Sequence, residues 1–474
     1  MQLHWHRRDL RGSDNRALAA AGRQADDADG GLIALFVFDD SVLEHAGAPR
    51  VAYLREALAE LRSWYRDRGG DLLIRRGDPR ETIPNIADAV DADRVVWNRD
   101  YSGLARERDA AVRQALADRD IARESFHDAI CHEPGSITTN AGDPYSVFTY
   151  FGRKWHDRDK DEPYPAPDPE QFVDSATAGI DSGTLPTVEE LGFAEPEAAL
   201  QTAGTAAARD RLSAFCEDAL YSYESDRDYP KRESTSRLSA DLKYGTIGVR
   251  EVYWASENAK QGASETETEE IEEFQSQLAW REFYTHVLWF HPHVVTENYK
   301  QYDNEIAWEN DPTLLAAWKN GETGYPIVDA GMRQLRAEGY MHNRVRMIVA
   351  SFLTKDLLID WRKGYAWFRE KLVDHDTAND NGGWQWAAST GTDAQPYFRI
   401  FNPMTQGERY DADAEYIKQY VPELRDADPS VIHNWHDASL TQRRRSAPDY
   451  PDPIVDHSER RERALAMFEA ARGD

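Results

Sequence analysis

The segment LIALFVF, residues 32–38, is the longest unbroken apolar run in the chain, and it determines the expected fold class. A short run of this kind, rich in β-branched and aromatic residues, is typical of a strand buried on both faces. Similar short apolar segments occupy residues 3–6, 71–76, 94–97 and 122–126. Stretches with helical character lie between them, at residues 51–66, 81–90 and 104–117. Strands that alternate with helices predict a parallel, doubly wound sheet.

The chain has 474 residues, which at about 150 residues per domain indicates two or three domains. We predict an α/β domain at residues 1–130, a linker at 131–208 and a helical domain at 209–474. Prolines cluster in the linker, at Pro163, Pro165, Pro167 and Pro169. Because structureless segments of this length are uncommon in compact proteins, we expect parts of the linker to be held in place.

The region after residue 209 has mostly helical periodicity. The clearest helices are predicted at residues 269–286, 312–320, 327–339 and 343–361. Tryptophans are frequent in this region, among them Trp254, Trp289 and Trp318. Such a helical domain has either an aromatic core or a binding site for a flat ligand.

Charge is the most unusual bulk property of the sequence. Acidic residues outnumber basic residues by 29, and 45 of the 56 basic residues are arginine. The preference for arginine and the acidic run at residues 265–273 favour a halophilic protein. Self-repulsion is tolerable in strong brine, because the Debye length at molar salt is about 3 Å. A local basic patch on an acidic protein can still contact DNA.

Two cysteines, Cys131 and Cys216, are too few for a disulfide scaffold or a cysteine-based zinc cluster. No apolar run approaches the roughly 18 residues that a membrane span needs. The polar N-terminal segment MQLHWHRRDLR does not look like a secretion signal. We therefore expect a cytoplasmic protein that makes no membrane contact and binds no metal.

Residues 235–239 (TSRLS) place three hydroxyls and a guanidinium within five positions. Hydroxyls, backbone N–H groups and arginine together suit a diphosphate. Serine and threonine in this setting are also common helix caps, so the motif alone leaves both interpretations open.

A second group of polar residues follows the predicted helix at 343–361. Helical spacing places Asn343 and Met347 on one face of that helix. The loop Asp374-His375-Asp376 comes next, and an ion pair between one of its carboxylates and Arg346 is a simpler interpretation than a metal site. Residues 379–383 (NDNGG) predict a tight turn before Trp384.

Taken together, these segments resemble the photolyase/cryptochrome flavoprotein family over nearly the whole chain. The matching stretches are residues 5–18 (WHRRDLRGSDNRAL), 235–239 (TSRLS), 280–284 (WREFY), 324–335 (GYPIVDAGMRQL), 341–347 (MHNRVRM) and 382–403 (GGWQWAASTGTDAQPYFRIFNP). Within the family the chain is most similar to class I cyclobutane pyrimidine dimer (CPD) photolyases, especially those of halophilic archaea. The resemblance implies an N-terminal α/β antenna domain, a long linker and a helical domain that binds FAD.

The resemblance also implies which residues line the flavin. They are Tyr223, Thr235, Ser236, Arg237, Leu238, Ser239, Phe274, Arg281, Asn343, Arg346, Asp374, His375, Asp376 and Asp380, with Arg346 paired to Asp374. Electrons are expected to reach the flavin along Trp384, Trp361 and Trp308. The implied activity is light-driven repair, in which reduced FAD donates an electron to the lesion.

The implied partner is UV-damaged DNA, bound by a monomer with the dimer flipped out of the helix. The lesion pocket is expected to contain Trp280, Asn343, Met347 and Trp386, and the DNA phosphates are expected at Arg227, Arg344 and Arg399. Indoles suit this role, since stacking on an aromatic side chain contributes about 1–3 kcal/mol per base.

A second pigment is common in the family. Phe36, Asp39, Arg50, Asp100 and Lys243 match positions that hold 8-hydroxy-5-deazaflavin in some relatives. An aromatic strand end with an arginine and a lysine suits a flat anion. Methenyltetrahydrofolate is the main alternative ligand.

Two positions depart from the family pattern. Gln277 stands where many CPD photolyases have Glu, and it can hydrogen-bond a base but cannot supply a charge or a proton. In these photolyases the residue expected beside the flavin N5 is usually Asn. Here it is Asp380, and plant cryptochromes also have Asp at this position. A buried carboxyl with no cationic partner would be neutral and could donate a proton there.

Three other functions are compared with this one from the sequence. A signalling cryptochrome is favoured by Asp380, and a (6-4) photolyase is disfavoured because Asn343 and Met347 replace that branch's pair of histidines. An acidic flavoprotein without a DNA role is disfavoured by the three arginines assigned to phosphates.

Overall fold

The computed structural model describes residues 1–27 and 30–473. Contacts divide the chain into two compact units. The sheet unit comprises Met1–Pro196, Gln201–Tyr221 and Thr235–Pro292, and the helical unit comprises Glu197–Leu200, Ser222–Ser234 and His293–Asp474. The predicted domains at 1–130, 131–208 and 209–474 follow sequence pattern rather than contacts, and that division remains a prediction.

The sheet unit is built on five parallel strands in the order β3-β2-β1-β4-β5. They are β1 (Gln2–His6), β2 (Leu32–Phe38), β3 (Leu72–Arg76), β4 (Arg94–Asn98) and β5 (Ala122–Phe126). All seven residues of β2 are buried, because helices cover both faces of the sheet. The predicted doubly wound fold is confirmed, and each predicted strand lies within a residue of the observed one.

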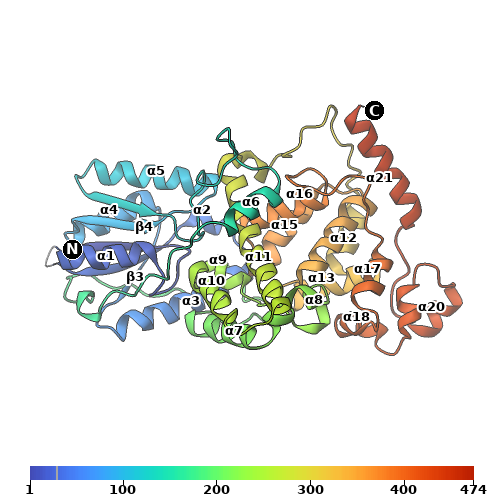
Figure 1. Ribbon diagram of the computed structural model, residues 1–474, viewed down its shortest axis with the longest axis horizontal. Helices are drawn as coiled ribbons and strands as arrows, with labels where there is room; N and C mark the ends of the chain where they lie inside the picture. Colours follow the sequence, from blue (N-terminus) through green and yellow to red (C-terminus); the bar gives the residue numbers. More distant parts are fainter. Residues whose placement is uncertain (28–29, 474) are drawn as a thin grey trace. The chain divides into compact units, whose positions relative to one another are not determined.

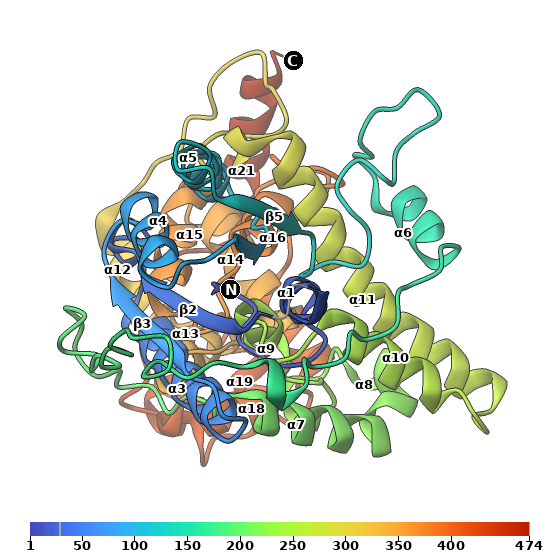
Figure 2. The same ribbon diagram turned by 90° about the vertical axis from the view of Figure 1, so that its left-hand side faces the viewer.

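Helices lie on both sides of this sheet, as Figure 2 shows. On one side are α1 (Arg16–Asp27) and α3 (Ala48–Arg66), and on the other are α4 (Pro79–Ala89) and α5 (Gly103–Ala117). The short α2 (Asp40–Leu43) follows β2. This arrangement follows from right-handed crossovers between parallel strands, because the strand order reverses at β1.

Parts of the predicted linker are held in place, as expected. It contains a helix, α6 (Phe148–His156), and a 3₁₀ turn at Pro169–Gln171. Phe172 forms an isolated parallel bridge with Leu32 of β2. Helix α6 was not expected from the sequence, and it packs on the longest helix of the unit through contacts of Phe151 with Phe283 and His286.

Four more helices belong to the sheet unit: α7 (Thr205–Glu217), α9 (Ser239–Tyr244), α10 (Val249–Ala259) and α11 (Glu265–Phe290). A buried ion-pair cluster joins α10 to the segment after β1. Arg250 binds Asp14 at 2.6 Å and Asp128 at 2.5 Å, and Arg11 binds Asp128 at 2.5 Å. Gly248 is needed here, because a Cβ at this position would lie 1.7 Å from Asp14 Oδ2. This cluster explains why α10 groups with the sheet.

The helical unit consists of helices and loops (Figure 1). Its helices are α8 (Tyr223–Asp226), α12 (Pro312–Asn320), α13 (Pro326–Glu338), α14 (Asn343–Ser351), α15 (Trp361–Lys371), α16 (Thr377–Ala387), α17 (Pro403–Tyr410), α18 (Glu415–Tyr420), α19 (Pro429–His433), α20 (Leu440–Ser446) and α21 (His457–Arg472). Its core is apolar and aromatic, and includes Trp318, Trp361, Trp384 and Trp435. Full burial of one such large side chain contributes about 1.5–3 kcal/mol.

Two local predictions in this unit are wrong. The helix predicted at 343–361 ends as α14 at Ser351 and continues only as a π-helical turn, Phe352–Asp356. Leu358 then takes a left-handed conformation with φ of 52°, and Asp360 caps the new helix α15. The tight turn predicted at 379–383 is instead part of α16, which begins where the Asp376 carboxylate accepts from two backbone amides. Capping and packing outweigh the cost of two helical glycines, about 1 kcal/mol each.

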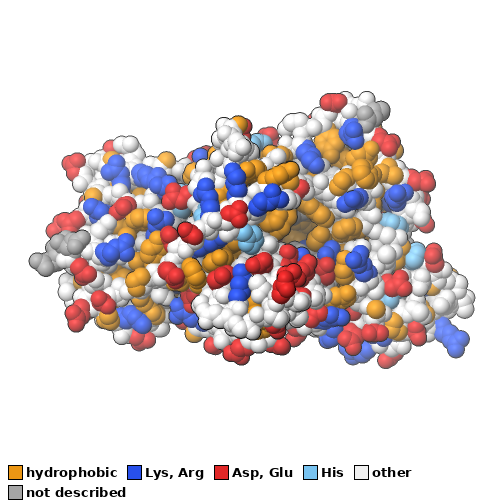
Figure 3. All heavy atoms as spheres, viewed as in Figure 1, with side chains coloured by type: hydrophobic (Ala, Val, Ile, Leu, Met, Phe, Trp, Pro, Cys, Tyr) orange, Lys and Arg blue, Asp and Glu red, His pale blue; other side chains and the backbone are white. Residues whose placement is uncertain are grey.

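No helix among the described residues is long and apolar enough to cross a membrane. The face seen in Figure 3 carries acidic and basic side chains mixed together, with hydrophobic side chains between them. The net charge of −29 is therefore accompanied on this face by many lysines and arginines.

Candidate functional site

The TSRLS motif lies in the sheet unit, in the loop that leads into α9. Thr235, Ser236 and Arg237 are half-buried, Leu238 is buried, and Ser239 is the exposed first residue of the helix. Arg237 has a left-handed backbone conformation with φ of 54°, which turns the chain sharply. The loop therefore presents hydroxyl and amide groups close together, the donor set that a diphosphate needs.

Phe274 and Arg281 stand two turns apart on α11 in the same unit. The Phe274 ring is buried and packs on Phe215 at 4.8 Å. Arg281 donates to the Leu242 carbonyl of α9 at 3.1 Å and to the Ala129 carbonyl. Arg281 thus ties α11 to the helix that follows the TSRLS loop.

The helical unit contains the charged part of the predicted flavin site. Arg346 of α14 binds Asp374 at 2.7 Å and lies 3.6 Å from Asp380 of α16. His375 Nδ1 lies 2.6 Å from Asp380 Oδ2, and the amide of Asp376 donates to the same oxygen. Burial opposes the charge of Arg346, but the Asp374 and Asp380 carboxylates outweigh it and raise the pKa of the guanidinium.

These contacts correct one premise about Asp380. A proton-donor role was expected for a buried carboxyl without a cationic partner. The structure gives Asp380 two partners, Arg346 at 3.6 Å and His375 at 2.6 Å. The premise of a carboxyl without a cationic partner is therefore not met.

The donors and acceptors present fit an isoalloxazine ring and a diphosphate. Asp374 Oδ1 and Trp384 Nε1 are buried without a hydrogen-bond partner in the described part of the chain. Buried polar atoms are rarely left unpaired, so these two atoms indicate a bound group with polar edges. Tyr223 of α8 is also buried in this unit, with the Arg227 guanidinium 5.6 Å from its ring.

The three tryptophans of the predicted electron path lie in the helical unit. Trp384 packs so closely on α15 that a Cβ at Gly364 would lie 2.1 Å from its ring, and Trp361 stands one turn earlier on that helix. Trp361 is fully buried and donates to Asn298 at 3.0 Å, whereas Trp308 is only half-buried. Trp318, which no sequence motif marks for this path, meets the Trp384 ring edge-on at 6.1 Å.

Lesion-binding residues were predicted in both units. On α11, the Gln277 amide donates to the Glu273 carboxylate at 2.8 Å, and Trp280 stacks on Phe148 of α6 at 3.7 Å. Phe148 was not predicted, since nothing in its sequence context marks it. On α14, Asn343 is exposed and its amide lies 3.8 Å from the sulfur of Met347. Trp386 of α16 is half-buried and lies 6.2 Å from Phe401.

The three arginines assigned to phosphates all lie in the helical unit. Arg399 is exposed, and Arg227 is half-buried at the end of α8. Arg344 binds Asp228 at 2.5 Å and lies over the Tyr410 ring at 4.5 Å. Arg344 is therefore held in one orientation by a carboxylate and a ring.

Three of the predicted antenna residues, Phe36, Asp39 and Asp100, lie towards or just after the carboxyl ends of their strands, the edge at which doubly wound folds bind ligands. Phe36 is on β2, Asp39 caps α2, Arg50 is on α3, Asp100 follows β4 and Lys243 is on α9. Burial opposes the charge of Asp100, but nearby Arg8, Arg7 and Lys243 lower its pKa to about 2. Asp39 accepts from Ser41 and lies 3.4 Å from Arg108. The structure thus brings Asp100 and Lys243 into electrostatic contact.

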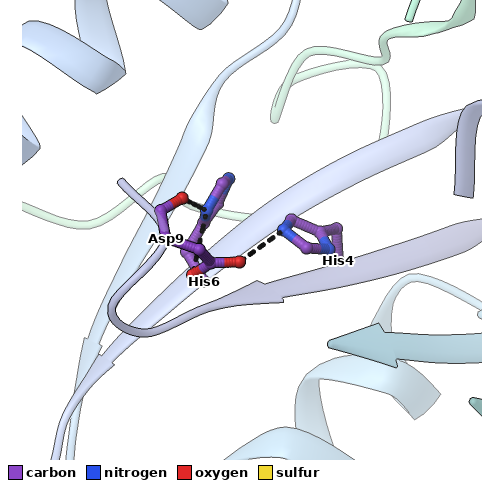
Figure 4. A group of neighbouring side chains, drawn as sticks. All are labelled: His4, His6 and Asp9. Atoms are coloured by element: carbon purple, nitrogen blue, oxygen red, sulfur yellow. Dashed lines mark hydrogen bonds and ion pairs between the residues drawn. The ribbon is translucent and has the colours of Figure 1, made fainter. Parts of the chain in front are cut away.

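His4, His6 and Asp9 form a buried cluster at the end of β1 with one ligand atom each within 4.8 Å of the others (Figure 4). His6 already binds the Asp9 carbonyl and the Tyr65 hydroxyl. Asp9 accepts from three further donors, the Arg7 amide and the side chains of Asn15 and Asn98. Burial lowers the pKa of His4 to about 4, so its ring is neutral at pH 7. His6 and Asp9 therefore fix the end of β1 by hydrogen bonds, whereas His4 Nε2 lies 3.6 Å from Asp9 Oδ2.

Comparison with known families matches both halves of the chain. Residues 2–170 match the family described as DNA photolyase, and residues 274–470 match the FAD binding domain of DNA photolyase. The deoxyribodipyrimidine photo-lyase of Halobacterium salinarum is 64% identical over 481 residues, which cover 100% of each chain.

Solved structures agree with these matches. A bacterial class III photolyase from Agrobacterium tumefaciens has a TM-score of 0.91 at 37% identity and covers 100% of this chain and 98% of its own. An archaeal photolyase from Sulfolobus tokodaii, described with two FAD molecules, has a TM-score of 0.83 at 32% identity and covers 99% of each chain. The chain therefore belongs to the DNA photolyase family.

Proposed function

We infer that this protein repairs cyclobutane pyrimidine dimers in DNA under light, as a deoxyribodipyrimidine photolyase. The observation that carries this conclusion is the full-length relative named for that activity, which is 64% identical over 100% of both chains. Relatives that share so much sequence over their whole length rarely differ in the groups that contact the substrate.

FAD is the cofactor that the donor set fits. The TSRLS loop would hold its diphosphate, and Arg346, Asp374 and Asp380 would meet the polar edge of its ring. Bound and reduced, FAD supplies the light-excited electron that splits the cyclobutane ring. The chain's own part is to bind, orient and exclude water. Arg346 and Asp374 neutralise each other at 2.7 Å, which keeps a buried charge pair next to the ring.

The lesion would be held by stacking and by a few polar contacts. Trp280 and Trp386 offer flat apolar surfaces for the two bases. Asn343 and Gln277 offer amides that can hydrogen-bond base edges, and Gln277 must first release Glu273 to do so. Met347 provides an apolar wall and cannot transfer a proton, which favours the cyclobutane dimer over the (6-4) photoproduct.

A second pigment would bind at the carboxyl edge of the sheet. Asp100 and Lys243 lie close enough to interact electrostatically. Phe36 lies on β2, in register with His6 at the end of β1. A flat anion such as 8-hydroxy-5-deazaflavin suits this mixture of ring and cation better than methenyltetrahydrofolate does. The Sulfolobus relative is described with two FAD molecules and as implying a novel light-harvesting cofactor, which supports a second pigment in this chain.

The decisive experiment is repair of an oligonucleotide with a single thymine cyclobutane dimer. Blue light should restore the intact thymines, and a dark control should leave the dimer. A matched oligonucleotide with a (6-4) photoproduct should stay unrepaired. No light-dependent repair of either lesion by flavin-loaded protein would instead favour a cryptochrome-type photoreceptor.

A further inference from the structure

The Trp280 ring is covered on one face by a residue from a different helix. Phe148 of α6 lies parallel to Trp280 of α11, with ring centroids 3.7 Å apart and planes at 11°. At this distance the two rings are in van der Waals contact, so no base can enter between them. Trp280 is only half-buried, so part of its surface remains open to solvent.

Phe148 is itself held from two further directions. Its ring meets the buried Phe283 of α11 edge-on at 5.9 Å. It also lies over Gly152, one turn further along α6, where an added Cβ would be 2.9 Å from the Phe148 ring. Phe148 is half-buried, and the indole face, the phenyl edge and the helix backbone hold its ring on three sides.

The surrounding surface shows that this contact is specific. Tyr284, one turn beyond Trp280, lies beside the indole at 5.7 Å and 33°. The neighbouring Tyr150 is 57% exposed and stacks instead on Tyr145 at 6.3 Å. Only Phe148 of these aromatic side chains lies flat on Trp280.

We propose that Phe148 is a positioning residue for lesion binding, which fixes the Trp280 indole and leaves a single face of it for the flipped pyrimidine. The proposal rests on the proposed function, because it assigns Trp280 to the lesion. It extends that assignment to the predicted linker, since α6 then helps to define the dimer pocket. Phe148 acts through Trp280 and does not touch the reacting bonds.

The proposal predicts a defect in binding that leaves the chemistry intact. Phe148→Ala frees the indole, so the affinity for a duplex with one thymine dimer should fall by about tenfold. That is roughly the largest change in an equilibrium constant that the loss of one aromatic pair causes. Affinity for the same duplex without the dimer should stay within about twofold, because no phosphate contact changes. Repair per absorbed photon at saturating dimer should equal that of the wild type.

Two further variants separate positioning from folding. Phe148→Tyr keeps the ring and should restore dimer affinity. Gly152→Ala should push the Phe148 ring off Trp280 while it strengthens α6, since alanine favours a helix by roughly 0.5–1 kcal/mol over glycine. Lower dimer affinity without a lower Tm in Gly152→Ala would isolate the stack from stability. This variant decides the question if Phe148→Ala loses flavin or unfolds.

Tyr150→Ala is the matched control, since it removes an exposed ring from the same helix. It should keep the wild-type preference for the dimer. Unchanged or tighter dimer binding in Phe148→Ala, or an equal loss in Tyr150→Ala, would overturn the proposal. These results are distinct from a failure of the proposed function, in which the wild type itself would show neither dimer preference nor light-driven repair.

Discussion

Arg250 Nε donates to Asp14 Oδ1 at 2.6 Å, and the two side chains are 3% and 1% exposed. The same guanidinium reaches Asp128 at 2.5 Å, so one residue of α10 neutralises two buried carboxylates beside the sheet. Buried ion pairs add little net stability compared with apolar packing, but removing one partner leaves an uncompensated charge. Replacing Arg250 would therefore leave the buried Asp14 carboxylate without its ion-pair partner.

Arg250→Ala should therefore lower the free energy of unfolding by about 3–5 kcal/mol. The measurement is denaturant unfolding of the flavin-loaded protein at fixed salt. Arg209→Ala is the control, because Arg209 pairs at 2.6 Å with the neighbouring Glu251 but is 47% exposed. A surface pair of this kind contributes about 0–1 kcal/mol. Equal losses in the two variants would contradict the assignment.

Asp374→Asn should weaken flavin retention more than Asp380→Asn does. Both substitutions neutralise a carboxylate near Arg346, but Asp374 is the closer partner, at 2.7 Å against 3.6 Å. Asp374 also has the buried oxygen without a hydrogen-bond partner, which the ring is expected to meet. The readout is the flavin-to-protein absorbance ratio after extensive dialysis. Greater flavin loss in Asp380→Asn would mean that Asp380 is the main contact.

Glu282 should make stability depend on pH. This side chain of α11 is 1% exposed, and burial raises its pKa from 4.5 to about 7. Between those values the folded chain binds a proton that the unfolded chain has released, so stability is greatest at the acidic end and is lost as the pH rises. Relative to Glu282→Gln, the wild type should lose about 3 kcal/mol between pH 4.5 and 7.

The wild type is compared with Glu282→Gln because buried histidines change the pH dependence of stability in the opposite direction. Burial lowers the pKa of His127 and His286 to about 4, so each of these disfavours the folded state as the pH falls. The effect of His127 cancels in the difference between wild type and Glu282→Gln, whereas His286 Nε2 lies 3.8 Å from the Glu282 carboxylate and responds to the substitution. The exposed Glu272 of the same helix is the control, and Glu272→Gln should leave the pH profile unchanged.

The fold could be predicted largely from the sequence because β2, a central strand of the sheet, is apolar on both faces. The observed β2 matches the predicted run at both ends, since every residue in it is buried. Helix α6 was not predicted, because it is only nine residues long and lies just before the proline cluster at 163–169. The helix at 343–361 was predicted too long, since the left-handed Leu358 that interrupts it carries no pattern.

The site could be predicted only in part. The residue types predict an ion pair between Arg346 and Asp374. In the structure the Arg346 guanidinium lies 2.7 Å from the Asp374 carboxylate. The contact of Asp380 with Arg346 could not be anticipated, because it depends on how α14 and α16 pack. The same limit applies to Phe148 and Trp280, which belong to helices far apart in the sequence. Contacts of this kind are set by tertiary packing and leave no local signal.

Dimer binding should depend only weakly on salt. Each neutralised phosphate contributes a slope of about −0.9 in log K against log salt, so three arginines give a slope of about −3 at most. Arg344 already binds Asp228 at 2.5 Å, which makes a shallower slope the better expectation. Arg399→Ala should reduce the slope by roughly one unit and affect damaged and undamaged DNA alike. A much steeper slope would reveal phosphate contacts beyond these three arginines.

Trp384→Phe should remove most of the light-driven reduction of bound, oxidised flavin. Trp384 is almost fully buried and packs on the helix that begins with Trp361, so it is placed for the first electron transfer. Phenylalanine keeps the packing but is far harder to oxidise than indole. Repair by protein that has been reduced chemically should persist, because that electron starts on the cofactor.

Trp318→Phe is the control that makes this prediction specific. Trp318 is as buried as Trp361 and its ring lies 6.1 Å from Trp384, so it shares the environment of the predicted path without belonging to it. If electrons pass from Trp308 through Trp361, Trp318→Phe should reduce flavin at the wild-type rate and Trp361→Phe should not. The reverse result would route the electron through Trp318, and wild-type reduction in Trp384→Phe would exclude both routes. Steady illumination with an external thiol, followed by flavin absorbance, is sufficient to distinguish these outcomes.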